Sequence, residues 1–477
     1  MSDSPPAPAS LTRPALSLLG FLAAAIALLA LVPVGHHDDV HALASALPVW
    51  TIAPFAALLL VIAIAPLAVP HRWEHNSVKA VVAGVLSVPV AAYFLLAWGP
   101  PGTAQLLEKA REYVSFMALL SSLFIISGGV VVRGSLSGTP LMNTALLAVG
   151  SLLASLVGTT GASMLLIRPL LRANVTREKK AHIVVFFIFV VSNCGGLLTP
   201  LGDPPLFLGF LKGVPFTWTL LHLGLPWLFV NGLLLVLFQF YDQAIFDAEE
   251  VRRPGSQIEE VLKHEPLRID GRRNLGLLLG VVALVFLSGQ LDWPFGVQEA
   301  GMVALAAVSF FATPGKLHQE NSFGFGPIVE VAVLFFGLFA TMAPALLLLN
   351  VHGPTLGLTR PWHFFWATGA LSSFLDNAPT YLTFAATASG LQGITVEGKY
   401  LAKLLTEHAE GPSLLAAISA GAVFMGANTY IGNGPNFMVK AVAEQSGLKM
   451  PSFFGYMAYS GGFLLPIFVA TTLLFFR

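Results

Sequence analysis

The sequence predicts an all-α polytopic membrane protein with about 11 transmembrane helices, two re-entrant hairpins and two broken helices in an inverted repeat. The first observation is that only 10% of the 477 residues are charged, while 55% are apolar. A soluble domain carries roughly 25% charged residues because its surface faces water. The second is that apolar stretches long enough to cross a bilayer core of about 30 Å recur along the chain. The third is a motif that occurs once in each half.

Eleven apolar stretches fit the length of a membrane-spanning helix. They are 14–34, 49–70, 78–98, 114–133, 182–210, 217–240, 274–291, 294–313, 326–349, 412–440 and 452–475. Two further apolar stretches, 141–171 and 361–388, are interrupted in the middle by small and polar residues. We interpret these two as re-entrant hairpins that enter and leave on the same side.

The distribution of basic residues supports two returning hairpins. With both hairpins returning, 18 of the 25 Lys and Arg residues fall on one side and 7 on the other. The richer side is cytoplasmic by the positive-inside rule. We therefore expect a multi-pass protein of the bacterial inner membrane, with a cytoplasmic N-terminus and the C-terminus in the periplasm.

The predicted organisation has four parts along the chain. An N-terminal tail and first transmembrane helix (1–48) precede the first repeat (49–240), and a charged cytoplasmic linker (241–273) leads to the second repeat (274–477). Each repeat contains five crossings, an odd number, so the second enters the membrane upside down. Inverted repeats with paired discontinuous helices indicate the binding site of a secondary transporter.

Two pairs of segments carry the repeat. TPLGDPPLF (199–207) aligns with TYIGNGPNF (429–437), and SLVGTTGAS (155–163) aligns with SFLDNAPTY (373–381). Glycine and proline in the first pair break a helix at membrane depth. Such a break survives only where it is buried in protein or lines a wet cavity. The breaks and hairpin tips therefore predict one site with four corners, at Gly158-Thr159, Gly202-Asp203, Asp376-Asn377 and Gly432-Asn433.

Two of these corners carry an acid. A charge at the bilayer centre costs roughly 2.5–3.5 kcal/mol on insertion scales, so an intramembrane carboxylate indicates function. The alternative is that each aspartate only caps a half-helix. The candidate ion- and substrate-binding residues are Asp203, Asp376, Asn377, Gly202, Thr199, Thr159, Thr160, Asn193, Thr429, Gly432 and Asn433, with Asp203 and Asp376 as the hypothesised sodium ligands.

The segments SNCGGLLTPLGDPP, SSFLDNAPT and GANTYIGNGPN resemble the ion transporter superfamily, in particular its group of bacterial citrate transporters and NhaD-type sodium:proton antiporters. The resemblance implies a homodimer with a rigid scaffold and a moving transport domain. Antiporters of this superfamily carry Gly-Asp in the broken helix and Asp-Asn in a hairpin, as Gly202-Asp203 and Asp376-Asn377 do here. Carboxylate-transporting relatives instead carry Ser-Asn-Thr at the hairpin tips. The first hairpin lacks Asp-Asn, which leaves the stoichiometry open.

The leading interpretation is secondary active sodium/proton antiport, with small ions and the lipid bilayer as partners and no cofactor besides the transported ions. The alternative is sodium- or proton-coupled transport of citrate or another carboxylate, although no Lys or Arg lies in the four corners. Among other classes, an intramembrane aspartyl protease is disfavoured because Asp203 follows Pro-Leu-Gly rather than Gly-x-Gly. A channel would not need two inverted half-sites. We expect no enzyme activity, and the zero net charge without a basic stripe disfavours a nucleic-acid partner.

Overall fold

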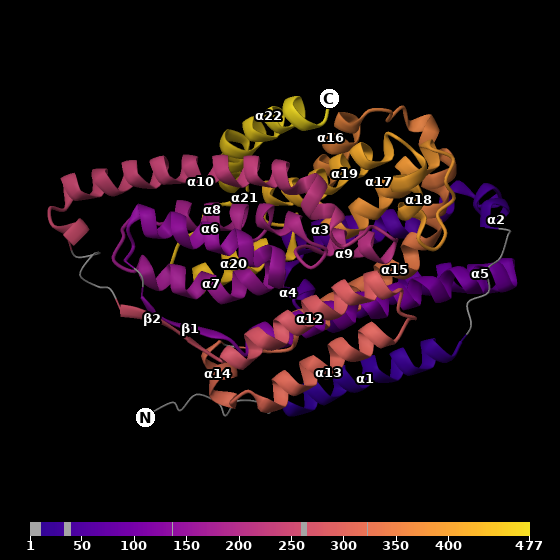
Figure 1. The fold of residues 1–477 in the computed structure, drawn as a ribbon, viewed down its shortest axis with the longest axis horizontal. Helices are drawn as coiled ribbons and strands as arrows, with labels where there is room; N and C mark the ends of the chain where they lie inside the picture. Colours follow the sequence, from indigo (N-terminus) through magenta and orange to yellow (C-terminus); the bar gives the residue numbers. More distant parts are fainter. Residues whose placement is uncertain (1–10, 33–39, 136, 259–264, 322) are drawn as a thin grey trace.

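The computed structural model describes residues 11–32, 40–135, 137–258, 265–321 and 323–477. Parts of the predicted tail (1–10 and 33–39) and of the predicted linker (259–264) lie outside these residues. The helices form two layers (Figure 1), which we call the scaffold layer and the site layer. The scaffold layer consists of α1 (Thr12–Leu31), α5 (Asn76–Gly128), α12 (Arg272–Leu291), α13 (Val297–Ala312) and α15 (Gly326–His352), and α3 (Ala53–Ala68) packs against its helices α5 and α15.

The site layer contains the predicted hairpins and broken helices. Its first part consists of α6 (Pro140–Val157), α7 (Thr159–Ala173), α8 (Ala181–Val190), α9 (Pro204–Leu211) and α10 (Trp218–Arg252). Its second part consists of α16 (Pro361–Ser372), α17 (Asn377–Leu391), α18 (Tyr400–Glu407), α19 (Gly411–Met425), α20 (Gly434–Gln445), α21 (Phe453–Tyr459) and α22 (Leu465–Phe475). Short helices α2 (Val40–Ala46), α4 (Pro70–Trp73) and α14 (Gly315–Glu320) connect longer ones.

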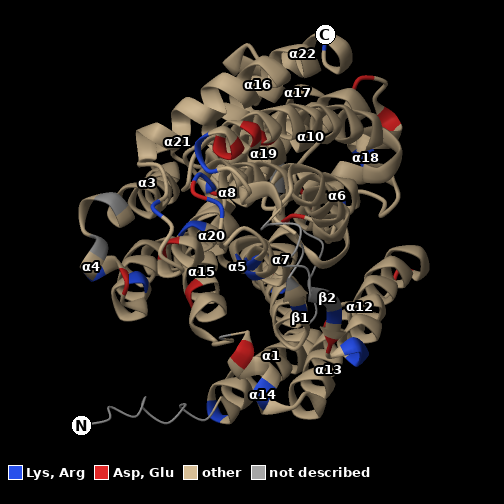
Figure 2. Ribbon diagram, turned by 90° about the vertical axis from the view of Figure 1, so that its left-hand side faces the viewer, with Lys and Arg blue, Asp and Glu red and all other residues tan. Residues whose placement is uncertain are grey.

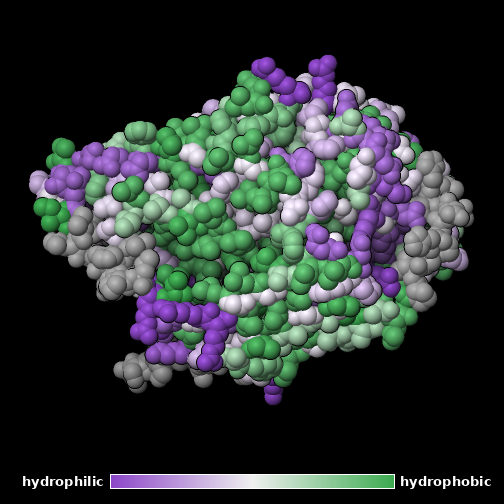
Figure 3. All heavy atoms as spheres, in the orientation of Figure 1, coloured by the Kyte–Doolittle hydropathy of each residue, from purple (hydrophilic) through white to green (hydrophobic). Residues whose placement is uncertain are grey.

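The surface of the molecule is that of a membrane protein. Among the described residues, ten helices are long and apolar enough to cross a membrane, and α13 is a shorter apolar helix. Hydrophobic side chains cover the middle of the face in Figure 3, with hydrophilic side chains toward its left and right ends. Figure 2 shows the left end, where Lys and Arg gather around α4, α14, α20 and the two strands. The predicted all-α membrane fold is confirmed.

Helix α5 holds two of the predicted spans in one run of 53 residues. The chain kinks at Gly99, which is followed by Pro100 and Pro101, and then returns through the scaffold as a helix to Gly128. The segment between the predicted spans 78–98 and 114–133 is therefore helical rather than a loop. It contributes the buried residues Glu112 and Lys109 to the protein interior.

The predicted linker at 241–273 is more structured than its charge suggested. Helix α10 continues to Arg252 because Asp242 and Glu249 are buried in ion pairs with Arg177, 2.8 and 3.4 Å apart. The linker ends in strand β2 (Glu265–Asp270), which pairs antiparallel with β1 (Val131–Ser135). Arg133 of β1 contacts Asp270 and lies 2.6 Å from Glu320, so this small sheet is fixed to α14.

Each half of the site layer contains a helical hairpin and a broken helix, as predicted. The hairpins turn at Gly158 between α6 and α7, and at Asp376 between α16 and α17. The broken helices are α8–α9, interrupted by the 3₁₀ turn Cys194–Leu198, and α19–α20, interrupted by Gly426–Asn428. The return of both hairpins to one membrane side stays a prediction.

Candidate functional site

The two helix breaks are built by the same contacts. The hydroxyl of Thr199 donates to the carbonyl of Ser155 in the first hairpin, and the hydroxyl of Thr429 donates to the carbonyl of Ser373 in the second. These four residues occupy equivalent positions in the two sequence repeats. Each break is thus tied to the hairpin of its own half, and both threonine hydroxyls, which we predicted as ligands, have a positioning role.

Glycine is required where each break folds back on itself. A Cβ on Gly202 would overlap the backbone of Gly196, and a Cβ on Gly432 would overlap the backbone of Gly426. These pairs are also equivalent in the repeat. At the first hairpin tip, the amide of Thr159 donates to the carbonyl of Gly202 over 2.8 Å. The close approach of backbones therefore fixes the corners before any side chain contributes.

Asp203 lies where the four predicted corners meet. Its carboxylate Oδ1 accepts hydrogen bonds from the Thr159 hydroxyl, at 2.9 Å, and from the Asn433 amide, at 3.3 Å. Its Oδ2 accepts from the side-chain amide of Asn377. One carboxylate therefore contacts residues from both hairpin tips and from the other broken helix. Asp203 is 1% exposed, and the side chains of these three partners are also buried.

The two predicted acids have different local roles. Asp203 precedes α9 at the capping position, but its side chain makes no capping hydrogen bond. Asp376 does cap its helix, because its carboxylate accepts from the amide of Ala378 over 3.0 Å. Capping therefore explains the presence of Asp376 and leaves Asp203 unexplained by helix formation. A buried carboxylate with only neutral donors carries a charge that the protein itself does not neutralise.

An asparagine network joins the two breaks behind Asp203. Asn193 donates to Asn436 at 2.6 Å and accepts from Asn433 at 3.2 Å. Asn436 in turn donates to the carbonyls of Gly426 and Thr429, both at 2.9 Å. We predicted Asn193 and Asn433 but missed Asn436. It lies three residues after Asn433 and hence on the same face of α20, which was a usable signal.

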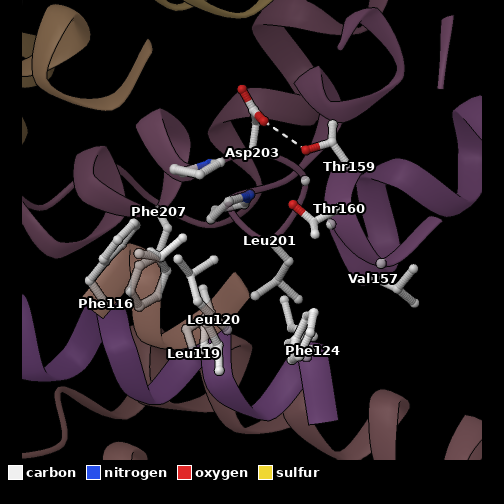
Figure 4. A pocket seen from close by; sticks show the side chains of 18 of the residues that line it. Phe116, Leu119, Leu120, Phe124, Val157, Thr159, Thr160, Leu201, Asp203 and Phe207 are labelled. Carbon is white, nitrogen blue, oxygen red and sulfur yellow. Dashed lines mark hydrogen bonds between the residues drawn. The ribbon is translucent and has the colours of Figure 1, made fainter. Parts of the chain in front are cut away.

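A cavity of about 80 Å³ opens beside Asp203, between the site layer and the scaffold layer. Figure 4 shows Asp203, Thr159 and Thr160 across from a row of apolar side chains of α5, with the Asp203 carboxylate directed toward Thr159 and away from that row. That volume has room for several water molecules. The lining residues include no Lys, Arg or His. The predicted residues Thr159, Thr160, Gly202 and Asp203 line this cavity, whereas Asn193, Asn377, Asn433, Thr199, Thr429, Gly432 and Asp376 do not.

The paired broken helices, the paired hairpins and the buried carboxylate between them are the features of a membrane transporter. A family profile described as "Putative citrate transport" matches residues 44–476, and the chain belongs to this family. No curated protein matches the chain. The family match covers both repeats, and helix α1 lies before it.

Proposed function

We propose that this transporter exchanges sodium ions for protons, and that Asp203 is the residue for which the two cations compete. The single observation that carries the proposal is a fully buried carboxylate surrounded by neutral donors from three corners. A charge without a countercharge at this depth is costly. Either a proton or a metal cation removes that cost, and the two cannot do so together at the same oxygens.

The surrounding groups suit a hard cation. The side-chain oxygen of Asn377 is buried and accepts no hydrogen bond from the protein. The proposed ligands are the oxygens of Asp203, Thr159 and Asn377, which come from three elements, because hard cations prefer oxygen ligands. Asp376, at the tip of the second hairpin, would add a second negative charge near the site. Its part in ion binding belongs to the proposal.

Coupled transport of citrate or another carboxylate is the second candidate, and the family description favours it. The cavity argues against it, because a multiply charged anion would meet Asp203 and no basic side chain. Helix starts at α9 and α17 offer only about half a positive charge each. Citrate therefore requires that bound cations first neutralise the carboxylates.

Purified protein in liposomes separates the two functions. With a proton gradient imposed and a pH dye inside, addition of sodium alone collapses the gradient if the protein is an antiporter. Under citrate transport, sodium alone does nothing, and labelled citrate accumulates when a sodium gradient is imposed. The second result would overturn the antiport proposal.

Two variants assign the exchange to the site. Asp203→Asn keeps the size of the side chain and removes its charge, so exchange should fall to the rate of empty liposomes. Asp292→Asn is the matched control, because Asp292 is exposed at the end of α12 and pairs with Lys399 at the surface. An Asp203→Asn protein that still exchanges at the native rate would contradict the assignment.

A further inference from the structure

A second group of charged residues lies outside the site, buried between the two layers. Lys212, at the end of α9, lies 2.7 Å from Glu108 and also contacts Glu112. Lys109 lies 3.0 Å from Glu112. Only Glu108 is appreciably exposed, at 22% of its side chain. Two acids and two bases balance here, and none of them contacts Asp203.

Lys212 belongs to the site layer. Its backbone carbonyl accepts a hydrogen bond from the amide of Leu401 over 3.0 Å, and its ammonium lies 5.7 Å from the ring centre of Tyr400. The next residue, Gly213, packs directly against Lys399 and Ala402. The end of α9 is therefore fixed to α18. Glu108, Lys109 and Glu112 belong to α5, so the ion pairs of Lys212 cross from one layer to the other.

The acids continue the cavity wall along α5. Glu108, Glu112, Phe116, Leu120 and Phe124 follow one another at intervals of four residues, so each side chain lies one turn from the next, in a row that winds slowly around the helix. The first two form the ion pairs, and the last three line the cavity. The cluster therefore begins one helical turn beyond the cavity, on the side of the Gly99 kink. The α5 residues that line the cavity, from Phe116 to Phe124, lie toward the end of the helix that leads into β1. Figure 1 shows this end of α5 beside β1.

We propose that Glu108, Lys109, Glu112 and Lys212 form a gate that closes the site toward the α18 end of the molecule. A transporter exposes its site to the two sides in turn by movement of one bundle against another. Opening toward the α18 end then requires Lys212 to separate from Glu108 and Glu112. The inference rests on the transporter fold, and it holds whether the cargo is sodium or citrate.

Charged residues suit such a separable contact. Apolar replacements of a buried ion pair are often neutral or stabilising, so burial of four charges is not explained by stability alone. Charged side chains regain water when the layers part, which keeps the open state accessible. The repeat-related helix α20 offers a contrast, because Lys440 pairs with Glu444 of its own helix, at 2.9 Å, rather than with the scaffold.

The test measures access to the cavity from the α18 end. In a Cys194→Ser background, Leu120→Cys places a thiol at the cavity wall, and Lys399→Cys marks the side that corresponds to the α18 end. A membrane-impermeant maleimide is applied to sealed vesicles of each orientation. With the gate intact, the thiol at position 120 should react slowly from the side on which the thiol at position 399 reacts.

The double variant Glu108→Gln/Lys212→Met removes the contact between the layers and leaves Lys109 paired with Glu112. Because one acid and one base are removed together, no unpaired charge stays buried. We expect labelling of the thiol at position 120 from the α18 end to rise about tenfold, which corresponds to about 1.4 kcal/mol. Glu108→Asp, which keeps every charge but shortens one side chain, should give a smaller rise and serves if the double variant does not fold.

The matched control is Lys440→Gln/Glu444→Gln, which removes an ion pair that lies within one helix. In this control, the thiol at position 120 should be labelled at the same rate as in the protein that keeps all of its native charges. Unchanged labelling in both gate variants would overturn the proposal, and so would an equal rise in the control. None of these outcomes depends on Asp203 or on the transported ion, so failure of the gate and failure of the antiport proposal are distinguishable.

Discussion

The two broken helices share a backbone and differ in charge and environment. Gly202 and Gly432 make the same close approach, and both breaks are tied to a hairpin by a threonine. Yet the first break presents Asp203 where the second presents Asn433. Phe207 of α9 is fully buried, whereas Phe437 of α20 is 56% exposed. The repeat therefore gives both broken helices the same backbone, whereas the carboxylate and the contact with α5 belong to the first broken helix.

This difference indicates which parts of the site depend on fold and which depend on conformation. The glycine crossings do not involve the scaffold, so they should persist in every state of the transporter. The burial of Phe207 and the ion pairs of Lys212 involve the scaffold on one side only. In an inverted repeat, an opposite state would exchange these environments between α9 and α20.

The largest effect is expected at the glycine crossings. Gly202→Ala and Gly432→Ala each force a Cβ against a backbone carbonyl, which cannot move aside as a flexible side chain would. Overpacking typically costs about 1–3 kcal/mol, and we expect the upper end of this range because neither backbone segment can move aside. Gly434→Ala is the control, because nothing lies within 4 Å of its added Cβ. Thermal unfolding in detergent measures the loss, and equal melting temperatures for all three variants would contradict a shared crossing.

An intermediate effect is expected at the phenylalanine pair. Phe207→Ala leaves a cavity, which costs 3–5 kcal/mol in soluble proteins; we expect about 2 kcal/mol here because lipid solvates apolar surface better than water does. Phe437→Ala removes an exposed side chain and should change stability by less than about 0.5 kcal/mol. The same unfolding assay compares them. Equal losses would show that α9 and α20 are packed alike in the dominant state.

The smallest effect separates capping from charge at Asp376. Asp376→Ala removes the hydrogen bond to Ala378 and should cost about 1 kcal/mol, whereas Asp376→Asn retains a good cap and should unfold almost like the native protein. If the carboxylate also contributes to ion binding, both variants lose exchange in liposomes. Native exchange by Asp376→Asn would restrict this residue to its structural role.

Much of the fold could be predicted because helix length, charge bias and the repeat are local properties of the sequence. The hairpin turns fall at Gly158 and Asp376, which the repeat aligns. Both helix breaks end directly before residues that we predicted to break the helix, since α9 begins at Pro204 and α20 at Gly434. The pairing of β1 with β2 could not be predicted, since it joins segments about 130 residues apart through tertiary contacts. The end of α10 was read as a loop because Asp242 and Glu249 appear solvated until Arg177 is placed beside them.

The site was predicted in part for a similar reason. The repeat identified the four corners, and the structure brings Asp203 together with Thr159, Asn377 and Asn433. The repeat could not show that the Asp376 carboxylate caps its own helix, because capping depends on the direction of the side chain. The gate was missed altogether. Lys109 and Lys212 lie between predicted spans, where charged residues are expected at the surface, whereas the structure buries both against glutamates.

The most direct test of the central proposal is proton release on sodium binding. Purified protein in unbuffered detergent solution, with a pH dye, should release about one proton per chain when sodium is added, because both cations bind the same carboxylate. Asp203→Asn should release none, and Asp292→Asn should behave as the native protein. Equal release from native and Asp203→Asn protein, or release only when citrate is added, would contradict competition at Asp203.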